Sequence, residues 1–446
     1  MHTDVRGFFT FIHAGLFYLG LALLLTLNLA ACGPQPAPTA SPTPTDTDHS
    51  LYLPAVGGEP SSPTPTQRAT PTPAISPLPS LTPTQGATPV SDLSPLPPPT
   101  PTPLPPAIFK PGWGIQVHLF GVDMGQTLAW AQGLGVQWIK QQVEWTNIEH
   151  APGEYEWGEL DYIVDQVNGH GFYLMLSLNH APGWTRTDPL EYGPPHDPAE
   201  FGRFMGVLAA RYQGRVAAYE LWNEPNLRRE WRGEPLDAAL FVALIREGAG
   251  GVRAADPAAQ VISGAPAVTG INDGETAIDD RVYLRGMVAA GVGGWVDGIG
   301  VHPYGFANPP TERWDDPAHR APSHNDHPSF FFRDTLEDYR SILVEGGLNA
   351  LPLWVTEFGW PSVDGLESMD TTGWEYARDV SETEQAGYVV EGFQMGRAMD
   401  GVGPMILWNL NIATIWGAGR PESAYGLLRP DGSYRPAYLA VRVAEP

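Results

Sequence analysis

Residues 107–446 alternate between short apolar runs and longer segments with apolar residues at helical spacing. A short run that is apolar on both faces is typical of a buried parallel strand, and apolar residues three and four positions apart are typical of a helix. The pattern predicts eight strands: Trp113–His118, Val136–Gln142, Phe172–Leu178, Val216–Trp222, Gln260–Ala265, Val296–Val301, Pro352–Thr356 and Pro404–Trp408.

Helical patterns lie between these runs. The predicted helices are Leu160–His170, Asp197–Tyr212, Leu236–Ala255, Arg281–Ala290, Phe330–Glu345, Glu382–Met399 and Pro436–Val443. Asp197-Pro198 indicates a helix start, and Ser381 with Glu384 indicates a capping box. Strands that alternate with helices predict a (β/α)8 (TIM) barrel. An open doubly wound sheet is the alternative, although no glycine-rich phosphate loop follows the first strand.

The first 106 residues have a different pattern. An apolar stretch from Phe8 to Leu29 runs into Leu29-Ala30-Ala31-Cys32, which resembles the lipobox of bacterial lipoprotein signals. We therefore predict a signal peptide at 1–32 with lipidation at Cys32. A retained membrane anchor is the alternative. Either places the rest of the chain outside the cytoplasm, as a cell-surface lipoprotein tethered to the bacterial membrane in the first case.

Residues 33–106 are rich in Pro, Thr and Ser and contain few large apolar residues, so they predict a disordered, extended linker. Cys32 is the only cysteine, so the domain at 107–446 has no thiol for a disulfide or a metal site. The formal net charge of −25 argues against nucleic acid as a partner. We expect a monomer that needs no cofactor and no metal.

Two glutamates follow predicted strands at equivalent positions, Glu224 after the fourth and Glu357 after the seventh. In a TIM barrel the active site lies at the C-terminal ends of the strands. Glycoside cleavage needs one carboxylic acid to protonate the leaving oxygen, and a carboxylate ~5–5.5 Å away to attack the anomeric carbon in retaining enzymes. Either glutamate alone would more often be a helix cap or a surface charge; the pair indicates catalysis.

The surroundings of the pair suggest how their protonation states differ. We expect His302 and Tyr304, after the sixth strand, to hydrogen-bond Glu357 and keep it ionised. We expect Glu224 to lie in a more apolar setting and to stay protonated. Glu220, within the fourth strand, points the same way and is expected to have a supporting role.

Aromatic residues at strand ends indicate a sugar site, because a flat ring covers the apolar face of a pyranose. Trp184, Trp360 and Trp408 are the candidates for stacking. Trp138 and Trp354 lie inside strands and are expected to fill the core. The histidines and aspartates of the loop 303–329 have no spacing typical of a metal site.

Several motifs resemble retaining glycoside hydrolases of the large clan whose catalytic glutamates follow strands four and seven. They are Val143-Glu144-Trp145 with Pro152-Gly153-Glu154-Tyr155-Glu156-Trp157, Trp222-Asn223-Glu224-Pro225-Asn226, Thr356-Glu357-Phe358-Gly359-Trp360, and Asp431-Gly432-Ser433-Tyr434-Arg435-Pro436. The resemblance covers nearly all of 107–446 and is greatest to family 39, with families 5 and 42 near by.

The resemblance implies roles for individual residues. Glu224 is the acid/base, Glu357 is the nucleophile, and Tyr304 orients Glu357. Asn223 binds the sugar 2-hydroxyl, and the pocket for the sugar that is attacked is lined by His180, His302 and Trp408. Several relatives have an arginine at the end of strand two, where this chain reads Lys140-Gln141-Gln142. Which residue takes its place stays open.

The sequence therefore predicts a retaining β-glycosidase that hydrolyses a polysaccharide or oligosaccharide by double displacement. An inactive carbohydrate-binding or adhesion protein on the same scaffold is one alternative, and a transglycosylase is another. The sugar, the linkage and endo or exo attack stay open.

Overall fold

The computed structural model describes residues 112–189, 192–315, 321–366 and 369–444. The signal peptide with Cys32 and the linker at 33–106 lie outside the described residues. Across the described ranges, no helix combines the length and the apolar character that a bilayer crossing requires.

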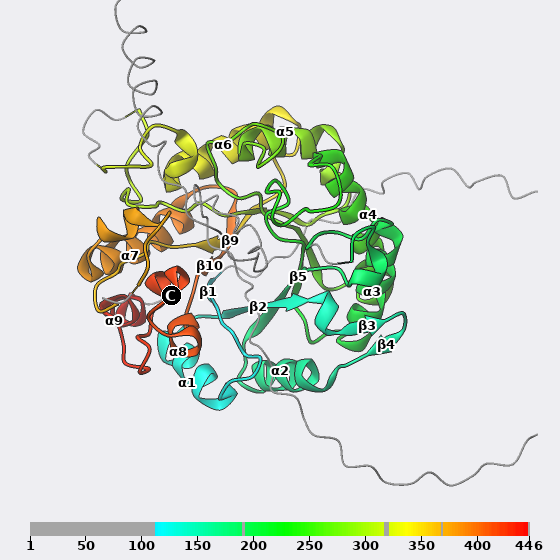
Figure 1. The fold of residues 1–446 in the computed structure, drawn as a ribbon, viewed down its shortest axis with the longest axis horizontal. Coiled ribbons are helices and arrows are strands. Elements are labelled where there is room, and N and C mark those ends of the chain that lie inside the picture. Colours follow the sequence, from blue (N-terminus) through cyan, green and yellow to red (C-terminus); the bar gives the residue numbers. More distant parts are fainter. Residues whose placement is uncertain (1–111, 190–191, 316–320, 367–368, 445–446) are drawn as a thin grey trace, which may run out of the picture. The chain divides into compact units, whose positions relative to one another are not determined.

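Eight parallel strands close into a barrel in the order β1-β10-β9-β8-β7-β6-β5-β2 (Figure 1). Their bounds are β1 Trp113–Gln116, β2 Trp138–Glu144, β5 Tyr173–Asn179, β6 Ala218–Leu221, β7 Gln260–Ser263, β8 Gly298–Val301, β9 Leu353–Phe358 and β10 Val402–Leu407. Each predicted strand overlaps one of these strands. The predicted (β/α)8 barrel is therefore confirmed, and the alternative of an open doubly wound sheet is wrong. All eight C-terminal ends surround one mouth, which is where the predicted glutamates lie.

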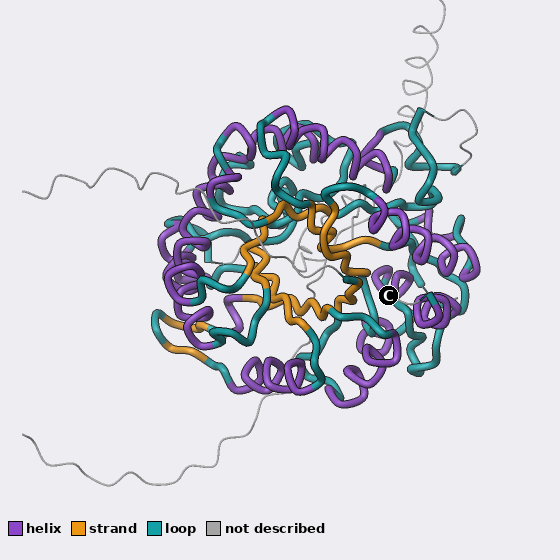
Figure 2. The backbone as a smooth tube through the Cα atoms, turned by 180° about the vertical axis from the view of Figure 1, so that it is seen from behind, coloured by secondary structure: helices purple, strands orange, loops and turns teal. Residues whose placement is uncertain are grey.

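Helices surround the strands (Figure 2). They are α1 Met124–Leu134, α2 Gly158–Gly169, α3 Pro198–Arg211, α4 Ala238–Ala255, α5 Asp280–Ala289, α6 Phe332–Glu345, α7 Glu382–Ala398, α8 Ile412–Trp416 and α9 Pro436–Val443. The seven predicted helices are confirmed with small shifts at their ends, whereas α1 and the short α8 were not predicted. Asp197 caps α3, and Ser381 and Glu384 form the expected capping box on α7.

A short antiparallel hairpin follows β2 and consists of β3 (Glu149–Ala151) and β4 (Glu154–Tyr155). The buried Glu149 accepts hydrogen bonds from the indole of Trp145 at 2.8 Å and from Gly153 N at 2.8 Å, and it pairs with Arg203 of α3 at 2.7 Å. These contacts fix the hairpin against the outer helices, on the side of the mouth where β2 ends.

The lower part of the barrel interior is apolar. It contains Trp138, Met175, Ala218, Ile262, Trp354 and Ile406. The rings of Trp138 and Trp354 meet edge to face, with centroids 5.3 Å apart, so the prediction that both fill the core is confirmed. Polar side chains inside the barrel begin one layer above this cluster, at Lys140, Ser177 and Glu220, which are wholly buried. Apolar side chains therefore fill the lower part of the barrel interior, and polar side chains line the part next to the mouth.

Strand β9 contains an irregularity that turns Glu357 toward the barrel interior. Trp354 points inward, so strict alternation would point Glu357 outward. Between Val355 and Phe358, however, β9 advances by one residue more than its partner β10 does between Met405 and Leu407. An extra residue of this kind is a β-bulge, which re-aims side chains and is frequent beside active sites.

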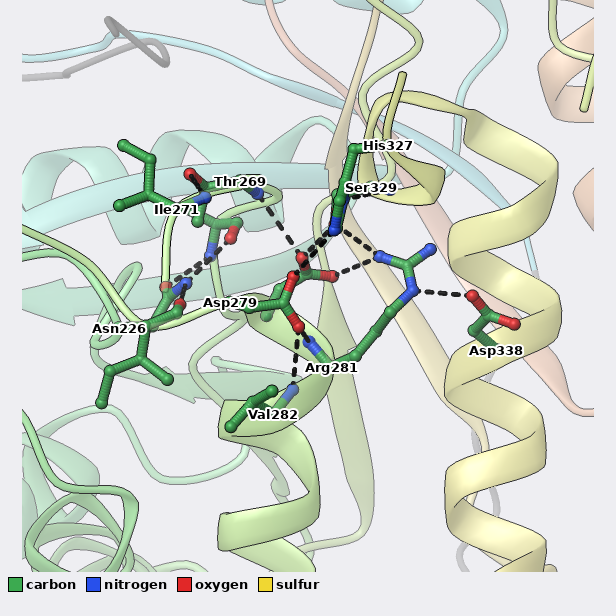
Figure 3. Close-up of polar contacts among 12 residues, drawn as sticks. Asn226, Thr269, Ile271, Asp279, Arg281, Val282, His327, Ser329 and Asp338 are labelled. Carbon is green, nitrogen blue, oxygen red and sulfur yellow. Dashed lines mark hydrogen bonds and ion pairs between the residues drawn. The ribbon is translucent and has the colours of Figure 1, made fainter. Parts of the chain in front are cut away.

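The long segment between β8 and α6 is fastened to α5 by a polar network (Figure 3). Ser329 Oγ donates to Asp280 Oδ1 at 2.6 Å and accepts from Arg281 at 2.6 Å. Arg281 also pairs with Asp338 of α6 at 2.6 Å. Because this segment begins with His302 and Tyr304, the network helps to hold the rim of the mouth on this side.

Candidate active site

Glu357 lies in the barrel mouth as a buried carboxylate with donors on both oxygens. Lys140 Nζ lies 3.0 Å from Oε1, and the Tyr304 hydroxyl donates to Oε2 at 2.9 Å. Gln116, with its amide nitrogen facing Glu357, donates to Oε1 at 3.0 Å. Burial by itself raises the pKa of a carboxyl, but Lys140, His302 and these hydrogen bonds outweigh it and hold the pKa of Glu357 below its usual value.

Lys140 is the cation beside Glu357 and was not predicted. It projects from β2 into the interior, where Nζ meets Glu220 at 2.8 Å, Glu357 at 3.0 Å and the Thr356 carbonyl at 3.1 Å. Lys140 thus makes two hydrogen bonds and an ion pair with Glu220. Burial opposes its charge, yet the two carboxylates raise its pKa, so it stays protonated. Lys140 thus lies beside Glu357. The resemblance had left open which residue takes the place of the relatives' arginine. Glu220 pairs with Lys140 and so has the supporting role that was expected of it.

Glu224 follows β6 and is held through both oxygens. Arg229 Nη2 donates to Oε2 at 2.8 Å, and His302 Nδ1 lies 3.2 Å from Oε1. The expectation of an apolar setting for Glu224 is therefore wrong, because an arginine from the following loop reaches back to it. His302 was expected beside Glu357, but it lies nearer to Glu224.

The distance between the two glutamates is limited by their shared contact with one atom of His302. His302 Nδ1 lies 3.2 Å from Glu224 Oε1 and 3.9 Å from Glu357 Oε2. These two oxygens are thus no farther apart than the sum of both distances, roughly 7 Å, a bound that includes the ~5–5.5 Å of retaining glycosidases. Two residues from opposite sides of the barrel therefore meet over one small volume.

The backbone that presents Glu224 is strained. Trp222 and Glu224 have φ angles of 78° and 42°, a region that few residues other than glycine adopt. Trp222 turns outward and packs against Trp231, with ring centroids 5.7 Å apart, while Glu224 turns back toward the mouth. Gly264, directly after the neighbouring strand β7, makes room, since a Cβ there would lie 2.5 Å from the Trp222 carbonyl oxygen.

Several buried polar atoms around the mouth have no hydrogen-bond partner among the described residues. They are both amide atoms of Gln142 and of Asn179, Asn223 Oδ1, His302 Nε2 and His118 Nε2. Buried polar groups normally find partners, so unpaired ones that gather at one place indicate a polar ligand or ordered water. These atoms come from the ends of five different strands and offer both donors and acceptors, as hydroxyl groups require.

The remaining predicted residues lie at different depths. His180 is nearly buried, with Nδ1 3.4 Å from Glu144 and its ring stacked on Tyr192. Asn223 hydrogen-bonds the buried Glu230. Trp408 is fully buried beneath the site, where its indole donates to Gln116 at 3.2 Å, so the prediction that its ring stacks on a sugar is wrong. Trp184 is partly exposed, and its indole donates to the Glu149 carbonyl at 3.2 Å.

Trp360 is a core residue. Its ring is fully buried, packs against Phe332 and Phe358, and donates from Nε1 to the Asn308 carbonyl at 2.7 Å. The prediction that it stacks on a sugar is therefore wrong, because the ring packs between β9 and the helices α6 and α7, where it also meets Tyr388.

The described residues contain no group of three or more His, Cys, Asp and Glu side chains arranged to hold a metal ion. The charged atoms nearest the two glutamates are instead those of Lys140 and Arg229.

Three residues of the site, Gln116, Lys140 and Arg229, were not predicted from the sequence. For Lys140 a signal was present, because a lysine and a glutamate inside two buried strands require each other as partners.

The fold is similar to that of several solved glycoside hydrolases. No protein-family model matches the chain, and no curated protein matches it. Among solved structures, a family 39 glycoside hydrolase from the gut symbiont Bacteroides cellulosilyticus WH2 superposes with a TM-score of 0.57 at 20% identity, over 75% of this chain and 63% of that one. The present chain thus spans less than two thirds of the Bacteroides protein.

Two further structures have the same fold. A glucosidase from Croceicoccus marinus has a TM-score of 0.53 at 14% identity, covering 76% of this chain and 67% of its own. A β-galactosidase from the psychrophilic Marinomonas ef1 has a TM-score of 0.50 at 15% identity, covering 75% of this chain and 58% of its own. At these identities the likeness establishes the fold alone. One of the three structures is a family 39 glycoside hydrolase, and family 39 is the family that the motifs resemble most.

Proposed function

We propose that the barrel is a retaining β-glycosidase that hydrolyses an oligosaccharide or polysaccharide, with Glu357 as nucleophile and Glu224 as acid/base. The observation that carries the proposal is the asymmetry of the pair. Glu357 is held ionised by Lys140, whereas Glu224 lies across His302 from it. A nucleophile must be a carboxylate before the reaction begins, and Glu357 has the surroundings for this.

In the first step a Glu357 oxygen attacks the anomeric carbon and forms a covalent glycosyl ester. The bond from that carbon to the leaving oxygen breaks, and this oxygen takes the proton of Glu224. In the second step Glu224, now a carboxylate, removes a proton from water as the water attacks the same carbon. The ester bond breaks, Glu357 is released as a carboxylate, and Glu224 is again protonated.

The neighbours have roles in the same proposal. Tyr304 donates to Glu357 Oε2, and burial raises the pKa of Tyr304 so that its hydroxyl keeps its proton. Lys140 and Gln116 both contact Oε1 of Glu357. Oε2 of Glu357 has fewer contacts and lies on the side of Glu224. In this proposal the unpaired atoms of Gln142, Asn179 and Asn223 bind sugar hydroxyls.

A panel of aryl β-glycosides tests the proposal. The wild type should hydrolyse at least one member, and Glu224→Ala and Glu357→Ala should each lower kcat by about 10³-fold or more on substrates with poor leaving groups. Product analysis with an added sugar acceptor separates hydrolysis from transglycosylation. If the wild type binds the sugars and turns over none, the carbohydrate-binding alternative holds and the proposed chemistry is wrong.

We also propose that Cys32 is lipidated and tethers the barrel outside the cytoplasm through the linker 33–106. The motif Leu29-Ala30-Ala31-Cys32 supports this. Metabolic labelling with a fatty acid should mark the wild type and leave Cys32→Ala unlabelled. Labelling of both proteins, or of neither, contradicts the lipid tether.

A further inference from the structure

His118 faces the barrel interior one layer above the proposed nucleophile. It follows β1, and its neighbours Val117 and Leu119 belong to the main apolar core, which the surrounding helices share. The backbone pairing of β1 with β2 continues through Val117. Because side chains alternate along a strand, His118 points the same way as Gln116, which contacts Glu357 Oε1 at 3.0 Å. His118 therefore lies on the wall of the mouth, about 7 Å farther along the strand than Gln116.

The ring of His118 is a neutral group with a buried nitrogen. Burial lowers the pKa of His118 to about 4, although the Glu357 charge opposes this, so the imidazole is neutral at neutral pH. A neutral imidazole has one N–H donor and one acceptor. Nε2 is buried and has no hydrogen-bond partner among the described residues. Since buried polar atoms normally have partners, this atom indicates a ligand hydroxyl or an ordered water.

Trp416 packs beside His118 in a fixed position. The two ring centroids lie 5.5 Å apart, with the planes tilted by 51°. Asn411, at the start of α8, exchanges hydrogen bonds of 3.0 and 2.9 Å with the backbone of His118, which holds α8 beside the end of β1 (Figure 1). Arg420 lies over the Trp416 ring, 5.1 Å from its centroid, and bonds the buried Glu422 at 3.3 Å. A half-buried indole held in this way offers an ordered apolar surface to the C–H groups of a sugar.

These two residues belong to the wall across the barrel from the proposed acid/base. In the closed strand order, β10 and β6 are separated by β9, β8 and β7 on one path and by β1, β2 and β5 on the other. Glu224 follows β6, whereas Trp416 lies on α8, directly after β10. In the proposed mechanism Glu224 protonates the leaving oxygen, so the leaving group departs on the side of Glu224. The opposite wall faces the part of the substrate that stays bound to Glu357 after the first step.

We propose that His118 and Trp416 form a specificity subsite for a second sugar, linked to the sugar that Glu357 attacks. The proposal rests on the function proposed above and adds that the retained part of the substrate has at least two sugar units. In this subsite the Trp416 ring contacts the C–H face of the second sugar, and His118 Nε2 shares a hydrogen bond with one of its hydroxyls. The enzyme therefore releases a disaccharide or cleaves within a longer chain.

Two 4-nitrophenyl β-glycosides test the proposal. The first has one sugar that the wild type accepts, and the second has the same sugar extended by a second sugar, with each common β-linkage tried in turn. The measured quantity is the ratio of kcat/KM for the extended substrate to kcat/KM for the simple one, from the release of 4-nitrophenol by the full-length protein. Both substrates have the same leaving group and the same attacked sugar, so the ratio reports the second sugar alone.

The wild type should favour the extended substrate, and Trp416→Ala should lower the ratio by about tenfold or more because the aromatic contact is lost. Trp416→Phe keeps a smaller ring and should give an intermediate ratio. His118→Phe keeps a flat ring without a polar atom and should lower the ratio by about threefold to tenfold, the usual value of one hydrogen bond.

Trp157→Ala is the matched control. Trp157 is also half-buried and also lies under an arginine, with Arg211 5.0 Å from its ring centroid, but it packs against Tyr212 at the end of α3. Loss of this ring removes a similar apolar area from the layer of outer helices. Trp157→Ala should therefore keep the wild-type ratio.

An equal ratio in the wild type, Trp416→Ala and His118→Phe overturns the proposal, and so does an equal fall in Trp157→Ala. A wild type that removes only single sugars from the extended substrate also overturns it. Trp416→Phe and His118→Phe secure the test if Trp416→Ala does not fold. If the wild type hydrolyses no member of the panel, the proposed function fails and this inference fails with it. If it hydrolyses the simple substrate with a ratio that neither residue affects, the inference alone fails.

Discussion

Lys140 and Glu357 form a buried ion pair across the barrel mouth, with Nζ 3.0 Å from Oε1 and the lysine side chain wholly inaccessible to solvent. Buried pairs seldom stabilise a fold more than apolar packing would, because both charges lose their hydration. We propose that the pair has another use, which is to fix the charge and the position of Glu357, the carboxylate proposed to attack. Glu220, 2.8 Å from Lys140, keeps the lysine itself charged.

Lys140→Met should move the acid limb of the kcat/KM profile to higher pH. The pKa of Glu357 lies below its usual value because Lys140 and other donors outweigh burial, so the pKa rises when the lysine is removed. At neutral pH, kcat/KM should also fall by about a hundredfold or more. Lys140→Arg keeps the charge and should keep the acid limb near its wild-type position. A wild-type acid limb in Lys140→Met contradicts the role given to the lysine.

Tyr304→Phe should lower kcat by about tenfold to a hundredfold, because a hydrogen bond to the Glu357 carboxylate is lost. Tyr425→Phe is a close control. Tyr425 is buried next to Tyr304, with ring centroids 5.6 Å apart, but its hydroxyl meets that of Tyr376 at 3.4 Å and no carboxylate among the described residues. Steady-state kinetics should show a much smaller loss in Tyr425→Phe. Equal losses in both variants would mean that Tyr304 acts through packing alone.

Gly264→Ala should lower Tm and activity together. A Cβ at this position meets the backbone carbonyl of Trp222, which is held at a strained φ to present Glu224. Relief requires a backbone shift that costs about 1–3 kcal/mol. Gly387→Ala on α7 is the control: its Cβ meets nothing within 4 Å, and alanine favours the helix, so its Tm should rise slightly. A Gly264→Ala protein as stable as the wild type argues against close packing here.

His118 should make the fold less stable in weak acid. Burial lowers its pKa to about 4 although the Glu357 charge opposes this, whereas an unfolded chain takes up the proton near pH 6.5. The unfolded state therefore binds more protons between these values, so stability falls as pH falls from 6.5 to 4. His118→Gln should flatten this dependence in urea unfolding at a series of pH values. An unchanged slope would show that His118 does not contribute.

The sequence predicted the barrel well because each strand is a short run of buried apolar residues, and such runs have few other uses. It also placed Glu224 and Glu357 at strand ends, since a carboxylate after a buried run needs a reason. Helix α1 was missed because MGQTLAWAQGL has weak amphipathic periodicity. Trp360 was misplaced because the position after a strand does not say whether the ring faces the mouth or packs against the surrounding helices.

The electrostatics of the site needed coordinates. The bulge in β9 that turns Glu357 inward has no signature in Leu353–Phe358, and alternation alone gives the opposite direction. Arg229 reaches Glu224 because the loop between β6 and α4 brings the two side chains together. Lys140 was the exception, since its place in an apolar strand already demanded a buried partner.

The reaction of the two alanine variants with azide tests the central claim most directly. Azide is small enough to enter the space that a lost carboxylate leaves. In Glu224→Ala it should attack the glycosyl ester on Glu357 and give the β-glycosyl azide; in Glu357→Ala it should replace the nucleophile and give the α-glycosyl azide. Nuclear magnetic resonance identifies each anomer. The account predicts opposite anomers from the two variants, and the same anomer from both, or the reverse assignment, would contradict it.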